Sequence, residues 1–310
     1  MHRIDGPGAT VDNRFTDGDP VGGIQATMVT DDWANDVQEE LMSVLAAAGI
    51  APVKGTQDQL LKSIRKMSSG VPGTAINLKM ASTGTNAIVS INADFICVAN
   101  SAGDQKTLSA VVIGSLNLAT SGVNGLDTGA MATNTWYATY VIWNPTTGVV
   151  AGLASLSYTN PTMPAGFTHR AFVESVRVGA TVTRIWPFRK RGRDVMYAPD
   201  PATDLAADFP NAVSGGTATS STPVSLVGLV PPNATSALMG LNSSGSVSSI
   251  AAVYAVPSGG VNRGLLAQAI TNGSSTTRTP FEVVDPFIYG INYAVTGTAT
   301  ATITVCGWRS

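Results

Sequence analysis

The chain has 310 residues, of which 12% are charged and 44% are hydrophobic, and its formal net charge is −2. This charge argues against nucleic-acid binding, which needs a basic face to neutralise phosphates. No stretch approaches the roughly 20 apolar residues that span a bilayer, so we expect no membrane insertion. A charged fraction about half the usual one leaves few polar residues to cover separate globules. We therefore expect other copies of the chain to cover part of the surface.

A leader rich in Gly, Asp and Pro precedes the first predicted helix, and it lacks the apolar core of a signal peptide. We expect the chain to be made in a cytosol and the leader to be extended. Thr30 or Asp31 can accept from the first N–H groups of the helix, and Gly49 suits a left-handed residue at its end. The apolar residues of the helix recur three and four positions apart: Trp33, Val37, Leu41, Val44, Leu45 and Ala48.

A second helix is predicted to start with Thr56 and Gln59 in the register of a capping box. Its apolar side carries Leu60, Leu61 and Ile64. The short link between the helices predicts an αα-hairpin whose apolar faces need a partner surface. That surface is either the β-structure of the same chain or, if the hairpin is a docking or trimerising head, another protein that the leader also grips. The two interpretations are equally supported by these residues.

The same residues resemble a known family. The run from Asp5 to Ile64 contains the segments Thr30-Asp31-Asp32-Trp33, Val37-Gln38-Glu39-Glu40, Ala47-Ala48-Gly49-Ile50 and Gln59-Leu60-Leu61-Lys62-Ser63-Ile64. In this order they resemble the N-terminal region of tail-fibre proteins from tailed bacteriophages, prophages and phage-tail-like bacteriocins. The resemblance implies a homotrimeric protein of the virion tail. Its N-terminal region would attach to tail or baseplate proteins, and its distal part would meet the host cell.

Beyond residue 71, alternation of apolar and polar residues replaces the helical period. The clearest hairpin has strands at 136–143 and 149–156, with a turn at Asn144-Pro145-Thr146-Thr147-Gly148. The region from 136 to 197 also resembles tail-fibre and receptor-binding proteins, less specifically than the head does. A Pro/Asp/Gly-rich passage at 199–216 reads as a linker or a domain edge. We therefore expect an attachment region at 1–70, a middle β-domain at 71–197 and a C-terminal antiparallel β-sandwich or jelly roll at 198–310.

One dense cluster of charge runs from Arg184 to Arg193. Its favoured interpretation is a solvated strand end. The functional alternative is a cationic patch that meets phosphate or acidic sugar on a bacterial envelope. The residues of that patch are Arg189, Lys190, Arg191 and Arg193.

Catalytic patterns are missing from the sequence. With His2 and His169 as the two histidines, no metal site or histidine-based triad is easily built, and we expect no cofactor. Cys97 and Cys306 lie in apolar runs and read as buried hydrophobes. A polysaccharide-cleaving tailspike would need two carboxylates placed on either side of a glycosidic bond. The candidates in the C-terminal part show no such pairing in the sequence: Asp204, Asp208, Glu282 and Asp285. We therefore expect a binding protein and not an enzyme.

Sugars are held by aromatic faces beside hydroxyl and amide groups. The candidate contacts for a polysaccharide or outer-membrane receptor lie in the C-terminal part: Trp308, Tyr254, Asn272 and Tyr289. For each of the three aromatic residues, a place in the core is the favoured interpretation. Together these patterns predict a tail fibre that binds tail proteins at one end and a bacterial receptor at the other. The alternatives are a structural baseplate or tail-tip protein without receptor contact, and a tailspike that cleaves polysaccharide.

Overall fold

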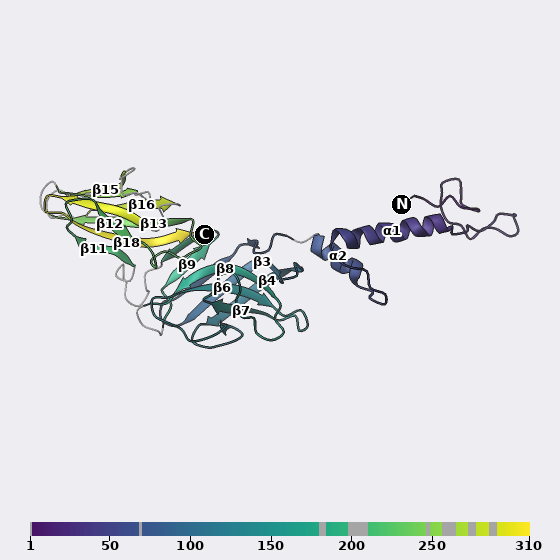
Figure 1. Cartoon of the computed structure of the whole chain (residues 1–310), viewed down its shortest axis with the longest axis horizontal. Helices are drawn as coiled ribbons and strands as arrows, with labels where there is room; N and C mark the ends of the chain where they lie inside the picture. Colours follow the sequence, from purple (N-terminus) through teal and green to yellow (C-terminus); the bar gives the residue numbers. More distant parts are fainter. Residues whose placement is uncertain are drawn as a thin grey trace. The chain divides into compact units, whose positions relative to one another are not determined.

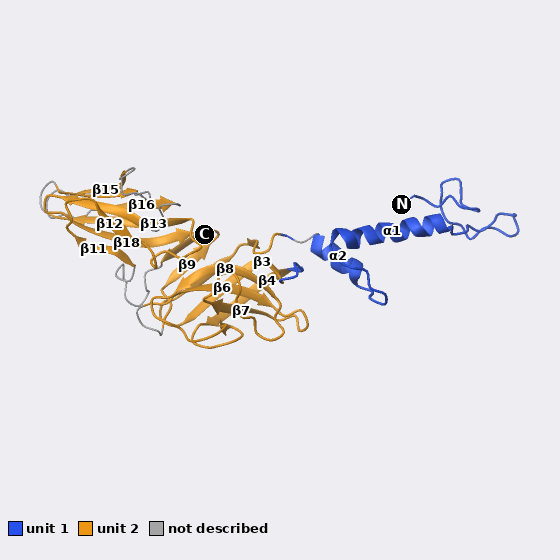
Figure 2. Cartoon of the chain, viewed as in Figure 1, with its two compact units in different colours: residues 1–70, 101–106 blue, residues 71–100, 107–310 orange. Residues whose placement is uncertain are grey.

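The computed structural model describes residues 2–67, 70–179, 184–197, 210–245, 249–255, 265–271, 277–284 and 290–310. The chain divides into two compact units, which are coloured separately in Figure 2. Unit 1 comprises residues 1–70 and 101–106, and unit 2 comprises residues 71–100 and 107–310. Tyr289 and Asn272, two of the predicted receptor contacts, lie outside the described residues.

Unit 1 contains α1 (Asp31–Ala47) and α2 (Gln59–Met67), which contact each other. The Thr30 hydroxyl accepts from the backbone N–H of Trp33 at 3.4 Å, and Gly49 has a φ of +65° just past the end of the helix. Both ends of α1 therefore form as the sequence predicts.

The start of α2 differs from the prediction. The helix begins at Gln59, whose side-chain amide donates to the Ala51 carbonyl at 2.7 Å and accepts from the Val53 N–H at 3.0 Å. Gln59 thus ties down the link between the helices and does not turn back to Thr56. The capping-box prediction is wrong, because the link offered Gln59 two backbone partners of its own.

The leader is folded back rather than extended. Ile4 is buried, the Met28 N–H donates to the Pro7 carbonyl at 2.9 Å, and the Thr27 hydroxyl donates to the Gly8 carbonyl at 2.8 Å. Gly6 is needed for this close approach, since a Cβ there would lie 2.7 Å from Cγ2 of Thr30. The expectation of an extended leader is therefore wrong.

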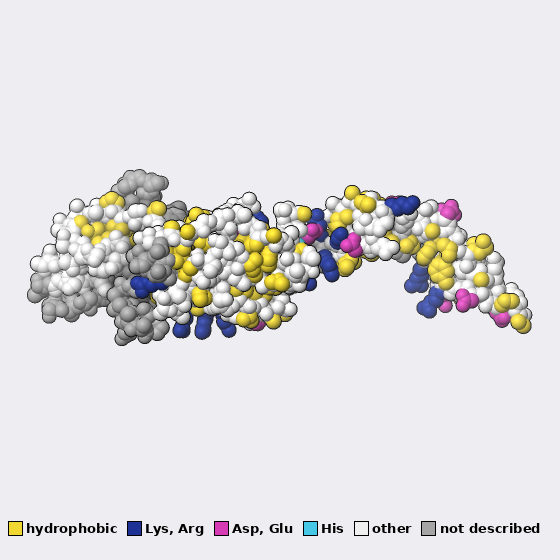
Figure 3. Space-filling view, turned by 90° about the horizontal axis from the view of Figure 1, so that it is seen from below, with side chains coloured by type: hydrophobic (Ala, Val, Ile, Leu, Met, Phe, Trp, Pro, Cys, Tyr) yellow, Lys and Arg dark blue, Asp and Glu magenta, His cyan; other side chains and the backbone are white. Residues whose placement is uncertain are grey.

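The helices of unit 1 leave much of their apolar faces exposed. Leu45 and Ala48 are buried, but Leu41, Leu61 and Ile64 are 46%, 48% and 49% exposed. Figure 3 shows hydrophobic side chains in yellow on the surface of this unit. The two small helices therefore present an exposed apolar surface in the single chain.

Unit 2 is built of strands (Figure 1). The strands of its N-terminal half are β1 (Ala75–Ile76), β2 (Lys79–Ser82), β3 (Ile88–Ala99), β4 (Gln105–Asn117, whose first residues fall in unit 1), β5 (Gly125–Leu126), β6 (Trp136–Trp143), β7 (Val150–Ser155), β8 (His169–Arg177), β9 (Phe188–Arg191) and β10 (Asp194–Tyr197). Those of its C-terminal half are β11 (Asn211–Gly216), β12 (Thr222–Ser225), β13 (Ser236–Ser244), β14 (Ser249–Ala255), β15 (Leu265–Thr271), β16 (Thr277–Val284), β17 (Gly290–Thr296) and β18 (Thr300–Arg309).

The strands form two sheets. The larger runs in the order β16-β13-β18-β10-β9-β2-β3-β8-β6-β7-β5, with β11 beside β18 and with β1 and β4 beside β3. The smaller runs in the order β12-β17-β14-β15. Nearly all pairs are antiparallel; β5 and β7 are parallel. The prediction of a mainly β chain with a small N-terminal helical region is confirmed.

The predicted hairpin is present, with β6 paired to β7 from Ala138↔Ser155 to Trp143↔Val150. Asn144 shapes its turn, because the side-chain oxygen accepts from the N–H groups of Thr146 and Thr147. Gly148 has a φ of +75°, which glycine adopts without strain.

Strand β18 joins the two halves of unit 2 into one sheet. It pairs with β10 on one side and with β13 on the other, so that Trp308 lies opposite both Val195 and Ala237. The boundary expected at 197/198 therefore lies inside unit 2. A fragment beginning near residue 200 would leave behind the strand that β18 needs. In the C-terminal half, apolar residues of both sheets share one core, among them Leu241, Val253 and Ile303.

No helix in the described part of the chain is both long and apolar enough to cross a membrane.

Candidate functional site

A buried carboxylate organises the side chains of one region of unit 2. Glu174 lies in β8 and is fully buried. Its Oε2 accepts from the Lys190 Nζ at 2.7 Å and from the Ser310 hydroxyl at 2.8 Å. Lys190 Nζ also donates to the Ser310 hydroxyl at 3.1 Å. A buried charge is tolerated only when it is paired and hydrogen-bonded, and Glu174 meets both conditions.

The other carboxylate oxygen is equally occupied. Oε1 of Glu174 accepts from the Asn233 side-chain amide at 2.7 Å, from the Ser175 N–H at 2.9 Å and from the Trp308 indole at 3.2 Å. The partners come from β8, from β18 and from the segment before β13. One carboxylate thus holds together segments that are far apart in the sequence.

A β-bulge precedes Glu174. Thr139 of β6 lies opposite Glu174, and the next residue, Tyr140, lies opposite Phe172, so Val173 has no partner in that ladder. The Thr139 hydroxyl donates to the Glu174 carbonyl at 2.6 Å. Bulges re-aim the side chains that follow them and are common beside functional sites.

Strand β9 separates the predicted cationic patch into two faces. Lys190 is buried, and its neighbours across the ladders are Met80 and Val195, whereas Arg189 and Arg191 are exposed. Lys190 therefore does not belong to a surface patch, because successive side chains of a strand point to opposite faces. Arg193 is exposed, and its Nε donates to the main-chain oxygen of Ser310 at 2.8 Å.

Trp308 is 1% exposed, so its ring has no face to offer to a receptor. Its centroid lies 5.2 Å from that of Trp136 and 5.4 Å from that of Tyr197, both in edge-on geometry. Burial raises the pKa of Tyr197. We therefore remove Trp308 from the candidate receptor contacts and assign it to the core. Tyr254 is half-buried in β14, where it pairs with Asn292 and Leu265.

The buried network lies beside an open pocket of about 510 Å³. Three of its polar lining residues, Lys190, Asn233 and Ser310, are those bonded to Glu174. The pocket is completed by Gly73, Ala75, Asn77, Leu78, Phe172, Val173, Gly192 and Arg193. Asn77 is held in turn by Asp94, which accepts from its side-chain amide at 2.5 Å.

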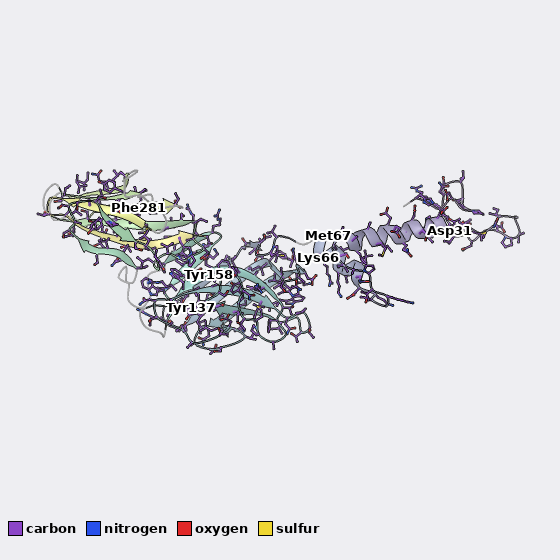
Figure 4. The ribbon with its side chains drawn as sticks, viewed as in Figure 1. Asp31, Lys66, Met67, Tyr137, Tyr158 and Phe281 are labelled. Carbon is purple, nitrogen blue, oxygen red and sulfur yellow. The ribbon has the colours of Figure 1, made fainter. Side chains whose placement is uncertain are left out.

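A second pocket, also of about 510 Å³, shares Gly73 and Phe172 with the first. It is lined further by Pro72, Thr74, Tyr140, Tyr158, Thr159, Arg170 and Ala171. Phe172 meets Tyr140 edge-on at 5.8 Å and Tyr158 at 5.9 Å between ring centroids. Figure 4 labels Tyr158 among the side chains of unit 2. Burial raises the pKa of Tyr140 to about 12, so this phenol is protonated at neutral pH.

Ser175 connects the two pockets. Its hydroxyl donates to the Tyr158 hydroxyl at 3.0 Å and also contacts the Asn233 side-chain oxygen. Arg170 is fixed as well, since its Nη2 donates to the Thr159 carbonyl at 2.9 Å. The lining is therefore held in place by bonds within the chain, which suits a binding site.

Of the four carboxylates considered for a glycosidase, Glu282 is the one that lies among the described residues. Glu282 accepts from Arg309 at 2.9 Å and from the Ser236 hydroxyl at 2.5 Å. Asp204, Asp208 and Asp285 lie outside the described residues. Among the residues that the structure covers, no three His, Cys, Asp or Glu side chains form a group that would hold a metal ion. Cys97 is buried and Cys306 is partly exposed, and the two are not joined in a disulfide. Burial raises the pKa of Cys97.

Of the residues that line the two pockets, Lys190 and Arg193 belong to the predicted cationic patch, and the others were not predicted from the sequence. One signal for them was available, because Glu174 interrupts the apolar strand Ala171-Phe172-Val173-Glu174-Ser175-Val176. A carboxylate in the middle of such a strand must find a partner if the strand is buried. The identity of the partners was not readable, since Asn233 and Ser310 lie 59 and 136 positions away.

Comparisons with known proteins gave one sequence match and several weak structural ones. No family model matches the chain. A segment of 73 residues is 44% identical to the uncharacterized protein StfP of Escherichia coli strain K12, covering 22% of this chain and 35% of that protein. Among solved structures, the chain is similar to an infectious bursal disease virus particle, with 12% identity, a TM-score of 0.17, and 76% of this chain and 66% of that chain covered. A subviral particle of its VP2 protein gives 12% identity and a TM-score of 0.18, with 78% and 69% covered. These TM-scores are too low to support a shared fold, so the function is inferred from the geometry of the two units.

Proposed function

We propose that this chain is a tail-fibre protein of a bacteriophage, a prophage or a phage-tail-like particle. It forms a homotrimer, attaches through unit 1 to tail or baseplate proteins, and binds a receptor on the bacterial surface through unit 2. The observation that carries the proposal is the exposed apolar face of α1 and α2. The order of sequence motifs in the head adds support.

The exposed face favours assembly for a physical reason. Helix α2 has nine residues, and isolated helices of fewer than about 12 residues are marginal in water. Its side chains Leu60, Leu61 and Ile64 are 38%, 48% and 49% exposed. Burying a fully exposed side chain of this size contributes about 1.5–3 kcal/mol, so covering the exposed part of each contributes roughly half of that. Three heads packed around an axis cover these faces with copies of the same surface, and closed symmetry prevents further growth.

Receptor binding is proposed for the two pockets of unit 2, in place of the C-terminal aromatics expected from the sequence. Tyr158 and Phe172 offer ring surface, and Asn77, Asn233 and Thr159 offer polar groups. Aromatic faces beside amide and hydroxyl groups are the usual means of holding sugar. In this proposal the two pockets lie on the surface of the trimer. The C-terminal half of unit 2, with its two sheets, is a β-sandwich of the jelly-roll type.

The test has two parts and uses the full chain. Light scattering after size exclusion measures the mass in solution, which we expect to be three times the 31.8 kDa chain mass at micromolar concentration. Fluorescently labelled chain is then incubated with a panel of bacterial strains that includes Escherichia coli K12, and we expect saturable binding to at least one strain. A monomer would overturn the trimer. A trimer that binds no cell would favour a structural baseplate or tail-tip protein.

A further inference from the structure

We infer that the two pockets of unit 2 form one groove that binds an anionic saccharide, with the arginines of the lining near its acidic groups and an aromatic surface against its sugar rings. This inference names the receptor class and rests on the proposed receptor-binding function. Its first support is continuity. Both pockets are lined by Gly73 and Phe172, so they meet along one edge. Each space has a volume of about 510 Å³, so together they are large enough for several sugar units.

The charged side chains that line the two pockets all have one sign. Arg170 lines the second pocket, Lys190 and Arg193 line the first, and no carboxylate side chain lines either pocket in the described part of the chain. Lys190 is neutralised by Glu174. The Nη2 of Arg170 donates to the Thr159 carbonyl, so this arginine is oriented by the chain but forms no ion pair with an acidic side chain among the described residues. Arg193 is held differently, because its Nε donates to a main-chain oxygen of Ser310, the last residue of the sequence.

Guanidinium groups recognise carboxylates and phosphates with paired, charge-assisted hydrogen bonds. A neutral sugar would leave Arg170 without a charged partner, whereas a uronic acid or a phosphorylated sugar would supply one. The shared chemistry is thus an acidic group on a saccharide, either carboxylate or phosphate.

The middle of the groove suits the sugar ring itself. Phe172 is half-buried between Tyr140 and Tyr158, and the Tyr158 ring is tilted 43° to it. Such rings present apolar surface for the C–H groups of a sugar, and the Tyr158 hydroxyl supplies a polar contact at the edge.

The groove is also preorganised. Glu174 fixes Lys190, Asn233 and Ser310, and Ser175 fixes Tyr158. Side chains that are already ordered lose less conformational entropy when a ligand binds. The fully buried Glu174 thus serves the site indirectly, as a positioning residue.

The experiment measures binding of the full chain to three immobilised polymers: polygalacturonate, which carries carboxylates; a phosphomannan, which carries phosphates; and neutral dextran. Two variants remove the groove cations, Arg170→Gln and Arg193→Gln. The matched control is Arg189→Gln, which removes the same charge from β9 on the face opposite to Lys190. We expect binding to at least one anionic polymer and none to dextran, with each groove variant weakening binding about ten-fold or more and the control leaving it unchanged.

Several outcomes overturn the inference: no binding to either anionic polymer, equal binding to dextran, or equal losses in Arg189→Gln and in the groove variants. If the chain binds bacterial cells but neither anionic polymer, the anionic-saccharide inference falls and the proposed receptor function stands. If it binds an anionic polymer through the groove but no cell, the inference about the site stands and the proposed function falls. Thermal unfolding of each variant shows whether a loss of binding is caused by misfolding. If an arginine variant fails to fold, Tyr158→Phe, which keeps the ring, replaces it, and we expect it to weaken binding by a smaller factor.

Discussion

The Nζ of Lys190 lies 2.7 Å from Oε2 of Glu174, and both side chains are buried. Removing one partner from such a pair leaves an uncompensated charge, which typically costs about 3–5 kcal/mol. We therefore expect Glu174→Gln to lower the free energy of unfolding by roughly this amount, as measured by chemical denaturation. The double variant of Glu174→Gln with Lys190→Met should recover part of the loss, because no buried charge is left.

A matched control for this prediction is Glu282→Gln. Glu282 also forms an ion pair, with Arg309 at 2.9 Å, but its side chain is 34% exposed and that of Arg309 is 45% exposed. Exposed pairs contribute about 0–1 kcal/mol. Equal losses in Glu174→Gln and Glu282→Gln would contradict the role assigned to burial.

Trp308 connects the last strand to the aromatic core. We expect Trp308→Ala to destabilise unit 2 by about 3–5 kcal/mol, because it removes a fully buried ring and the indole bond to Glu174. Trp308→Phe keeps part of the ring contacts and should cost less. Both variants are followed by thermal unfolding. If Trp308→Ala folded as stably as the wild-type chain and lost receptor binding, the core assignment would be wrong.

The leader is held to α1 by His2, whose Nδ1 lies 2.7 Å from Oδ2 of Asp36. The hydrogen bond to Asp36 raises the pKa of His2 above 6.5, and the same bond lowers the pKa of Asp36 below 3.8. The contribution of His2 is therefore complete below pH 6.5 and is lost as the pH rises through its raised pKa. The contribution of Asp36 is lost as the pH falls through its lowered pKa.

This contact is checked by following the His2 ring signals by NMR during a pH titration. We expect the His2 pKa to fall back toward 6.5 in the variant Asp36→Asn. The variant Asp32→Asn, which changes a carboxylate in the first turn of the same helix, serves as the control. A His2 pKa that does not respond to Asp36→Asn would show that the contact is absent in solution.

The exposed apolar face of the head predicts an assembly defect. We expect the double variant of Leu61→Ser with Ile64→Ser to shift the chain from trimer toward monomer at micromolar concentration, measured by light scattering. Because each side chain is about half exposed in the single chain, covering it on assembly contributes roughly 1 kcal/mol per chain of the trimer. The control is Val112→Ser, since Val112 is an apolar residue that is 74% exposed in β4. Loss of the trimer in the control alone would place the interface in the β-structure.

The local elements follow from short stretches of sequence. The period of α1, its Thr30 cap and Gly49 end, and the hairpin with its Asn144 turn are all readable because their partners lie within a few residues. Prediction failed where a side chain had a choice of partners. Gln59 bonds to Ala51 and Val53 instead of Thr56, and the leader folds back through Gly6 and Gly8.

The sequence alone determined the class of the chain: a short helical region followed by β-structure, with too few charges to cover its surface and two apolar helical faces to hide. These properties depend on composition and on periods of two and about 3.6 residues. Only the tertiary structure decided the site. Alternation along β9 buries Lys190 and exposes Arg189, the bulge at Val173 precedes Glu174, and strand β18 brings Trp308 and Ser310 to that carboxylate. A buried charge takes its partners from whatever the fold places within about 3 Å, and that proximity depends on strand order and register, which no local pattern encodes.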